Sequence, residues 1–177
     1  SIASAATHPV YLLDLHTVSS DSPSFVVLED SLPARRFASA FPLPMILGLE
    51  ETLHGLLIDD ATQRLGCVSC IVESGQHDDP RSADVHEALV LIALESLGMI
   101  DAGAITSTGE RPRVVAASAA GGRAGHVYDF RHRVEVAHDS FTMHSQAVAF
   151  SRVPTGDTVL ATERSRPIKA GAAGLLF

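Results

Sequence analysis

The sequence predicts an α/β domain over residues 1–108, followed by a small all-β domain over residues 109–177. In the first part, short apolar runs alternate with segments whose apolar residues recur at helical spacing. This pattern is typical of a sheet flanked by helices. After Ala104 the helical spacing disappears, and short strand candidates are separated by turn residues. The segment between the two patterns, residues 106–113, is a linker by composition.

The first part contains strand candidates and helix candidates in alternation. The strands are expected at residues 10–15, 24–28 and 66–72, and the helices at residues 33–41, 48–61 and 82–97. Ser31 and Ser82 are the expected N-caps, because a serine hydroxyl accepts a hydrogen bond from the first helical turn. Gly98 is expected to end the last helix, since glycine tolerates the left-handed conformation found there.

The second part shows short apolar segments between turns. Strands are expected at residues 114–117, 124–130, 133–138, 147–152, 158–161 and 168–176. We see no internal repeat and no low-complexity tract. This pattern of short apolar segments separated by turns predicts a small β domain.

Composition excludes several classes of partner. Thirteen Lys and Arg residues against twenty-one Asp and Glu give a formal charge of −8, which argues against nucleic acid or an anionic membrane as the main partner. No apolar run has the roughly 18 to 20 residues of a membrane span. The first residues lack the cationic and apolar regions of a signal peptide. Two free cysteines without a disulfide framework suit the cytoplasm, where we expect the protein. The chain starts with Ser1 and both ends lie close to strand candidates, so we expect a fragment of a longer protein.

Cys67 and Cys70 form a C-x-x-C pattern, which invites a zinc or redox interpretation. The surrounding run is β-branched and apolar, and residues three apart on a strand point to opposite faces. A structural zinc site would also need a second cysteine pair. We therefore expect two free, buried thiols.

Two residues that could take part in catalysis or metal binding follow apolar strands. His16 lies in Asp14-Leu-His-Thr17, and Glu73 lies in Ile71-Val-Glu-Ser-Gly-Gln-His77. The carboxyl ends of parallel strands meet at one sheet edge, where α/β active sites form. A neutral imidazole is a common zinc ligand, Asp14 could orient it, and a carboxylate can act as general base. The plainer alternative makes His16 a hydrogen-bonded loop histidine and Glu73 an exposed turn residue.

The order of these motifs resembles the succinylglutamate desuccinylase/aspartoacylase family. Asp14-Leu-His-Thr17 is similar to that family's third metal-ligand motif, and Val72-Glu-Ser-Gly-Gln-His77 is similar to its catalytic-glutamate segment. Further resemblance lies in the family's C-terminal β domain, at residues 128–133, 141–143, 156–161 and 168–171. The resemblance implies part of a zinc-carboxypeptidase-like mixed sheet flanked by helices. It also implies zinc-dependent hydrolysis of the amide of an N-acylated amino acid, with His16 as a zinc ligand and Glu73 as general acid/base.

The chain departs from the family pattern at the metal site. The family's other two ligands come from a His-x-x-Glu motif upstream of the third, and neither that motif nor the family's Asn/Arg segment for the substrate carboxylate occurs upstream of His16 in this sequence. Substitute ligands could come from His77, Asp78, Asp79 or His86, which otherwise form a solvated loop and helix start. A catalytic zinc needs three protein ligands, so we expect this chain alone to be inactive and to hold zinc poorly. Arg64 is either a substrate-binding residue, as the family sometimes places one there, or an ordinary surface arginine.

A second hypothesis is a non-enzymatic binding module. The segments at residues 156–161 and 168–171 resemble the turn-and-strand rhythm of lipoyl or biotinyl carrier domains. Lys169 is the only lysine, but it falls within a strand candidate, whereas carriers present lysine at a hairpin tip. We also expect the exposed edge of a partial sheet to favour pairing with another copy of the chain.

Overall fold

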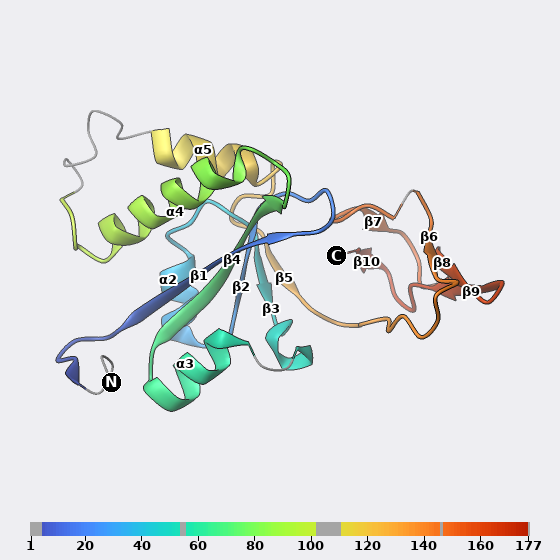
Figure 1. Ribbon diagram of the computed structural model, residues 1–177, viewed down its shortest axis with the longest axis horizontal. Helices are drawn as coiled ribbons and strands as arrows, with labels where there is room; N and C mark the ends of the chain where they lie inside the picture. Colours follow the sequence, from blue (N-terminus) through green and yellow to red (C-terminus); the bar gives the residue numbers. More distant parts are fainter. Residues whose placement is uncertain (1–4, 54–55, 102–110, 146, 177) are drawn as a thin grey trace. The chain divides into compact units, whose positions relative to one another are not determined.

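The computed structural model describes residues 5–53, 56–101, 111–145 and 147–176. The chain forms two compact units. The first comprises Ser1–Ser19 and Pro23–Arg131, and the second comprises Ser20–Ser22 and His132–Phe177. Figure 1 shows the course of the chain through both.

The described part of the first unit contains a mixed five-stranded sheet in the order β1-β4-β2-β3-β5. Its strands are β1 (Tyr11–Val18), β2 (Phe25–Leu28), β3 (Met45–Leu47), β4 (Val68–Gln76) and β5 (Val127–Asp129). β2 runs antiparallel to β4, whereas the other neighbouring strands are parallel. All four residues of β2 are buried, as expected for a central strand covered on both faces.

Helices cover both faces of this sheet. They are α2 (Leu32–Ala38), α3 (Leu57–Leu65), α4 (Ser82–Ser96) and α5 (Arg111–Ala119), with a short 3₁₀ turn at Glu50–Thr52. In Figure 1, α4 and α5 lie on one side of the strands and α3 lies on the other. In the described parts of the chain, no helix is long and apolar enough to cross a membrane.

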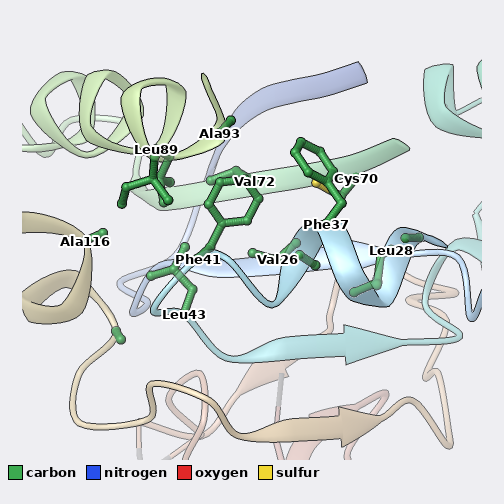
Figure 2. Close-up of a cluster of buried hydrophobic side chains, with 14 of the residues drawn as sticks. Val26, Leu28, Phe37, Phe41, Leu43, Cys70, Val72, Leu89, Ala93 and Ala116 are labelled. Atoms are coloured by element: carbon green, nitrogen blue, oxygen red, sulfur yellow. The ribbon is translucent and has the colours of Figure 1, made fainter. Parts of the chain in front are cut away.

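The main core lies between the sheet and the helices α2, α4 and α5. Alternate residues of the central strands enter it, because successive strand side chains point to opposite faces. Figure 2 shows this cluster, which includes Val26, Leu28, Phe37, Phe41, Leu43, Cys70, Val72, Leu89, Ala93 and Ala116. The rings of Phe37 and Phe41 meet edge to face at 5.4 Å between centroids.

The first two strand predictions and the first helix prediction are confirmed. Ser31 caps α2 as expected, since its hydroxyl accepts a hydrogen bond from the Ala34 amide. Gly98 follows α4 with a positive φ of 66°. The N-cap prediction for Ser82 is wrong, because Ser82 is the first residue of α4 and its hydroxyl donates to β4 carbonyls instead.

In the first unit, two secondary-structure predictions need correction and one strand was missed. β3 was not predicted, and the helix predicted at residues 48–61 is replaced by the 3₁₀ turn and α3, with residues 54–55 outside the described ranges. The strand predicted at residues 114–117 is helical. A short apolar run cannot be assigned by periodicity alone, and here Ala116 and Ala120, one helical turn apart, are completely buried in the core.

The described part of the second unit contains only short strands, as predicted. They are β6 (Thr142–Met143), β7 (Arg152–Val153), β8 (Val159–Glu163), β9 (Arg166–Lys169) and β10 (Gly174–Leu175). β6, β8 and β9 form one antiparallel sheet, and β7 pairs with β10. The strand predicted at residues 133–138 is not formed. Those residues are exposed, and the Glu163 carboxylate accepts hydrogen bonds from the Ala137 and His138 amides.

The compact units divide after Arg131, whereas the domain boundary was predicted after residue 108. The reason is that α5 packs against α4 and β5 pairs with β3, so both belong to the first unit. Most of the predicted linker lies outside the described residues, and residues 111–113 begin α5. A domain boundary in the linker stays a prediction that limited proteolysis can test.

Candidate functional site

The predicted site residues His16 and Glu73 lie opposite each other on neighbouring strands. β1 and β4 run parallel and side by side (Figure 1), and His16 is the register partner of Glu73. Register partners on neighbouring strands carry their side chains on the same face of the sheet. Sequence reasoning put both residues just beyond their strands, whereas both lie within them, because β1 continues to Val18 and β4 to Gln76.

Asp14 orients the His16 ring. The His16 Nε2 atom lies 3.1 Å from Asp14 Oδ1, and the two residues are two positions apart on β1, so they share a face. The Asp14 side chain is 18% exposed and the His16 side chain 53% exposed. A carboxylate that holds one ring nitrogen fixes the tautomer and direction of the imidazole. His16 therefore presents its remaining nitrogen, Nδ1, in a defined orientation.

The Glu73 carboxyl is half-buried and incompletely satisfied. Its Oε2 atom is buried and has no hydrogen-bond partner among the described residues. Burial raises the pKa of Glu73 above its ordinary value, the nearby His16 opposes the rise, and Asp14 adds to it. A carboxyl group with a raised pKa can take up and release a proton closer to neutral pH, as a general acid/base must.

Immediately after the His16–Glu73 pair, β4 contains a bulge. Between the pairs His16–Glu73 and Val18–Gln76, β4 has one more residue than β1, and Gly75 adopts a positive φ of 91°. The hydrogen bonds that hold the bulge come from α4, through Ser82 and His86. Sequence reasoning missed these roles, although a glycine inside a strand pattern is a signal for a bulge.

The other predicted candidates lie near the site or away from it. The His77 Nδ1 atom lies 2.7 Å from Thr17 Oγ1, and Asp79 pairs with Arg81 at 2.7 Å, while Asp78 is exposed. Arg64 lies in the last turn of α3, before the amino end of β4, and pairs with Asp60 at 3.1 Å. The structure therefore does not bring Arg64 to His16 and Glu73, which lie toward the carboxyl ends of their strands.

The described residues do not make up a complete zinc site. No group of three or more His, Cys, Asp or Glu side chains is arranged to hold a metal among the residues that the structure describes. His86 is directed to the His16 carbonyl oxygen, and His77 to Thr17. The described residues therefore do not fit a complete catalytic zinc centre, which needs three protein ligands.

The cysteine prediction is confirmed. Cys67 and Cys70 are free and buried. Burial raises the pKa of the Cys70 thiol to about 12, so this thiol is neither a nucleophile nor a ready metal ligand. The other histidines are predicted to be structural or surface residues, and of these His54 lies outside the described residues.

Solved structures with the same fold are known, although no protein-family model matches the sequence and no curated protein matches it by sequence. One is a succinylglutamate desuccinylase/aspartoacylase from Rhodobacter sphaeroides, with 16% identity over 98% of this chain and 54% of that chain and a TM-score of 0.58. Another is the product-bound ectoine utilization protein EutE (DoeB) from Ruegeria pomeroyi, with 17% identity over 92% of this chain and 51% of that chain and a TM-score of 0.52. The chain thus spans about half the length of each. The predicted fold class, part of a zinc-carboxypeptidase-like mixed sheet flanked by helices and followed by a small all-β domain, is confirmed.

Proposed function

We propose that this chain carries the acid–base part of an amide-hydrolysing centre that acts on N-acylated amino acids in the full-length protein. The observation that carries the proposal is the pairing of His16 with Glu73 in register on adjacent parallel strands. Asp14 orients the histidine, and the carboxyl of Glu73 is partly desolvated. The fold shared with a succinylglutamate desuccinylase/aspartoacylase supports this proposal, and the sequence motifs at both residues favour it.

Glu73 has the properties that amide hydrolysis requires of a general acid/base. A water must lose a proton as its oxygen bonds to the amide carbon, and the leaving amine must gain a proton as the C–N bond breaks. A half-buried carboxylate with a raised pKa can accept the first proton and return it in the second step. We assign this proton transfer to Glu73.

His16 is the proposed contribution of this chain to a zinc ion. It is exposed enough to meet a ligand, and Asp14 holds its ring. Because the described residues do not complete a metal centre, the other ligands would have to come from residues beyond those described. The residue that binds the substrate carboxylate would have the same origin, since Arg64 is directed to Asp60 and lies away from Glu73.

The test is Glu73→Gln in the full-length protein, assayed on a panel of N-acetyl and N-succinyl amino acids. We expect kcat to fall about 100-fold or more, as positioned acid–base groups usually contribute, with the zinc content unchanged. Glu87→Gln is the matched control, because Glu87 is exposed on α4. Near-normal turnover in Glu73→Gln would remove Glu73 from the mechanism, and a wild-type protein that hydrolyses none of the substrates would refute the proposed function.

The alternative of a carrier module is not favoured. Lys169 lies in β9 and its Nζ atom is 2.8 Å from Asp157 Oδ1. The tip of the β8–β9 hairpin is formed instead by Arg164 and Ser165, both with positive φ. A carrier lysine would have to stand at that tip.

A further inference from the structure

The bulge in β4 stands directly beside the proposed catalytic pair. Two residues of β4, Ser74 and Gly75, lie opposite Thr17 alone, and the disruption begins one residue after Glu73. A bulge bends its strand, increases the local twist and re-aims neighbouring side chains, and bulges are frequent next to active sites. The bulge conformation therefore influences the direction in which the Glu73 side chain points from the sheet.

The first turn of α4 holds the β4 side of this bulge. The Ser82 hydroxyl is buried and lies 2.9 Å from the Ser74 carbonyl oxygen and 3.3 Å from the Gln76 carbonyl oxygen. A hydroxyl has one proton, so Ser82 shares it between the two carbonyls that flank Gly75. Ser82 thus contacts the carbonyl groups on both sides of Gly75, and the Gln76 carbonyl oxygen also accepts a hydrogen bond from the Asp79 amide at 3.0 Å.

The second turn of α4 holds the β1 side. The His86 Nε2 atom lies 3.0 Å from the carbonyl oxygen of His16. A carbonyl oxygen only accepts, so His86 Nε2 carries the proton and donates it. The Ser74 hydroxyl, at 3.4 Å, points to the same carbonyl oxygen. The peptide that follows His16 is thus fixed from α4.

We propose that Ser82 and His86 are positioning residues that clamp β1 and β4 at the bulge and so set the direction of the Glu73 carboxyl relative to His16. The two are four residues apart, which places them on the same helix face one turn apart. One contacts β4 and the other contacts β1, so a single helix face fixes both strands where the catalytic pair stands. The catalytic consequence rests on the proposed function, whereas the clamp itself does not.

The clamp is tested first in the chain itself by ¹H–¹⁵N NMR. We expect Ser82→Ala to shift the Gly75 amide signal and His86→Ala to shift the Thr17 amide signal. In each case the carbonyl group of the same peptide loses its hydrogen-bond donor. The conservative variants Ser82→Thr and His86→Gln keep a donor at the same place and should restore both signals. Unchanged amides in folded alanine variants would overturn the clamp, whatever the protein's activity.

The positioning role is tested by kinetics in the full-length protein. Misplacement of a catalytic group by about 1 Å can cost on the order of 100-fold, so we expect kcat of each alanine variant to fall about 10- to 100-fold. KM should stay within about twofold, since substrate contacts are untouched. Ser82→Thr and His86→Gln should recover most of kcat. A loss that these variants do not restore, or one confined to KM, would refute positioning, and a wild-type protein without amidase activity would refute only the proposed function.

Discussion

Glu73 should lower the stability of the first unit, and Glu73→Gln should therefore stabilise it. A buried polar atom without a partner costs about 1–3 kcal/mol, and Oε2 of Glu73 is such an atom. Because the residue is only half-buried, solvent screens part of the penalty, and we expect a gain of about 1 kcal/mol near neutral pH. A neutral amide is less costly to desolvate than a carboxylate, so glutamine retains the shape and loses the larger penalty.

The pH dependence identifies the cause of this gain. The folded pKa of Glu73 is raised above its ordinary value of 4.5, so the native state binds the proton more tightly than the unfolded state does. The wild type therefore loses stability relative to Glu73→Gln as pH rises through the folded pKa. The difference between the two proteins should be about 1 kcal/mol near pH 8 and should be nearly gone at about pH 3, where the carboxyl is neutral in both states.

Urea unfolding followed by tyrosine fluorescence measures this difference in the first compact unit, which contains Glu73. The chain has no tryptophan and two tyrosines, and both Tyr11 in β1 and Tyr128 in β5 belong to the first unit. Glu87→Gln is the control, because Glu87 is exposed and the same substitution there should leave stability nearly unchanged. A Glu73→Gln protein that is less stable than wild type near pH 8, or whose advantage grows as pH falls, would refute the reasoning.

The remaining predictions concern metal and domain boundary. After treatment with equimolar zinc and dialysis, the purified chain should retain far less than one zinc per chain and show no amidase activity, because His16 alone cannot hold the ion. Stoichiometric zinc together with turnover would show that nearby residues complete the site. Brief digestion of the native chain should cut first within residues 106–113, the segment that composition identifies as a linker. Mapped first cuts inside residues 82–98 would contradict both the boundary and the helix.

Sequence reasoning placed the two candidate residues together because its signals are local. A histidine and a glutamate at the ends of apolar strands sufficed to predict that they share a sheet edge, and His16 and Glu73 are register partners. Whether the residues after Glu73 form a loop or continue the strand was harder to predict. Residues 73–76 are polar or small, which suggests a loop, yet β4 continues through them because pairing with β1 and the hydroxyl of Ser82 satisfy their backbone.

The errors in the fold come from features that depend on contacts distant in sequence. Residues 114–117 have the composition of a strand, and only the burial of Ala116 against α4 explains why they are helical. β3 has three residues, too few for a periodic pattern, and it exists because β2 and β5 pair with it on either side. Among the short strands of the second unit, β8 overlaps the strand predicted at residues 158–161, whereas no strand forms at residues 133–138.

The buried side-chain oxygen atoms that lack a hydrogen-bond partner among the described residues are not distributed evenly. The unpartnered buried side-chain atoms among them belong to Glu50, Ser69 and Glu73, and two of these residues lie on β4. Ser69 and Glu73 are four positions apart on that strand, so they face the same side of the sheet as His16. A fold selected for stability alone would replace such groups or supply partners for them. Of the two, only Glu73 stands beside His16, so its unpartnered oxygen lies where the proposed function requires a proton-accepting group.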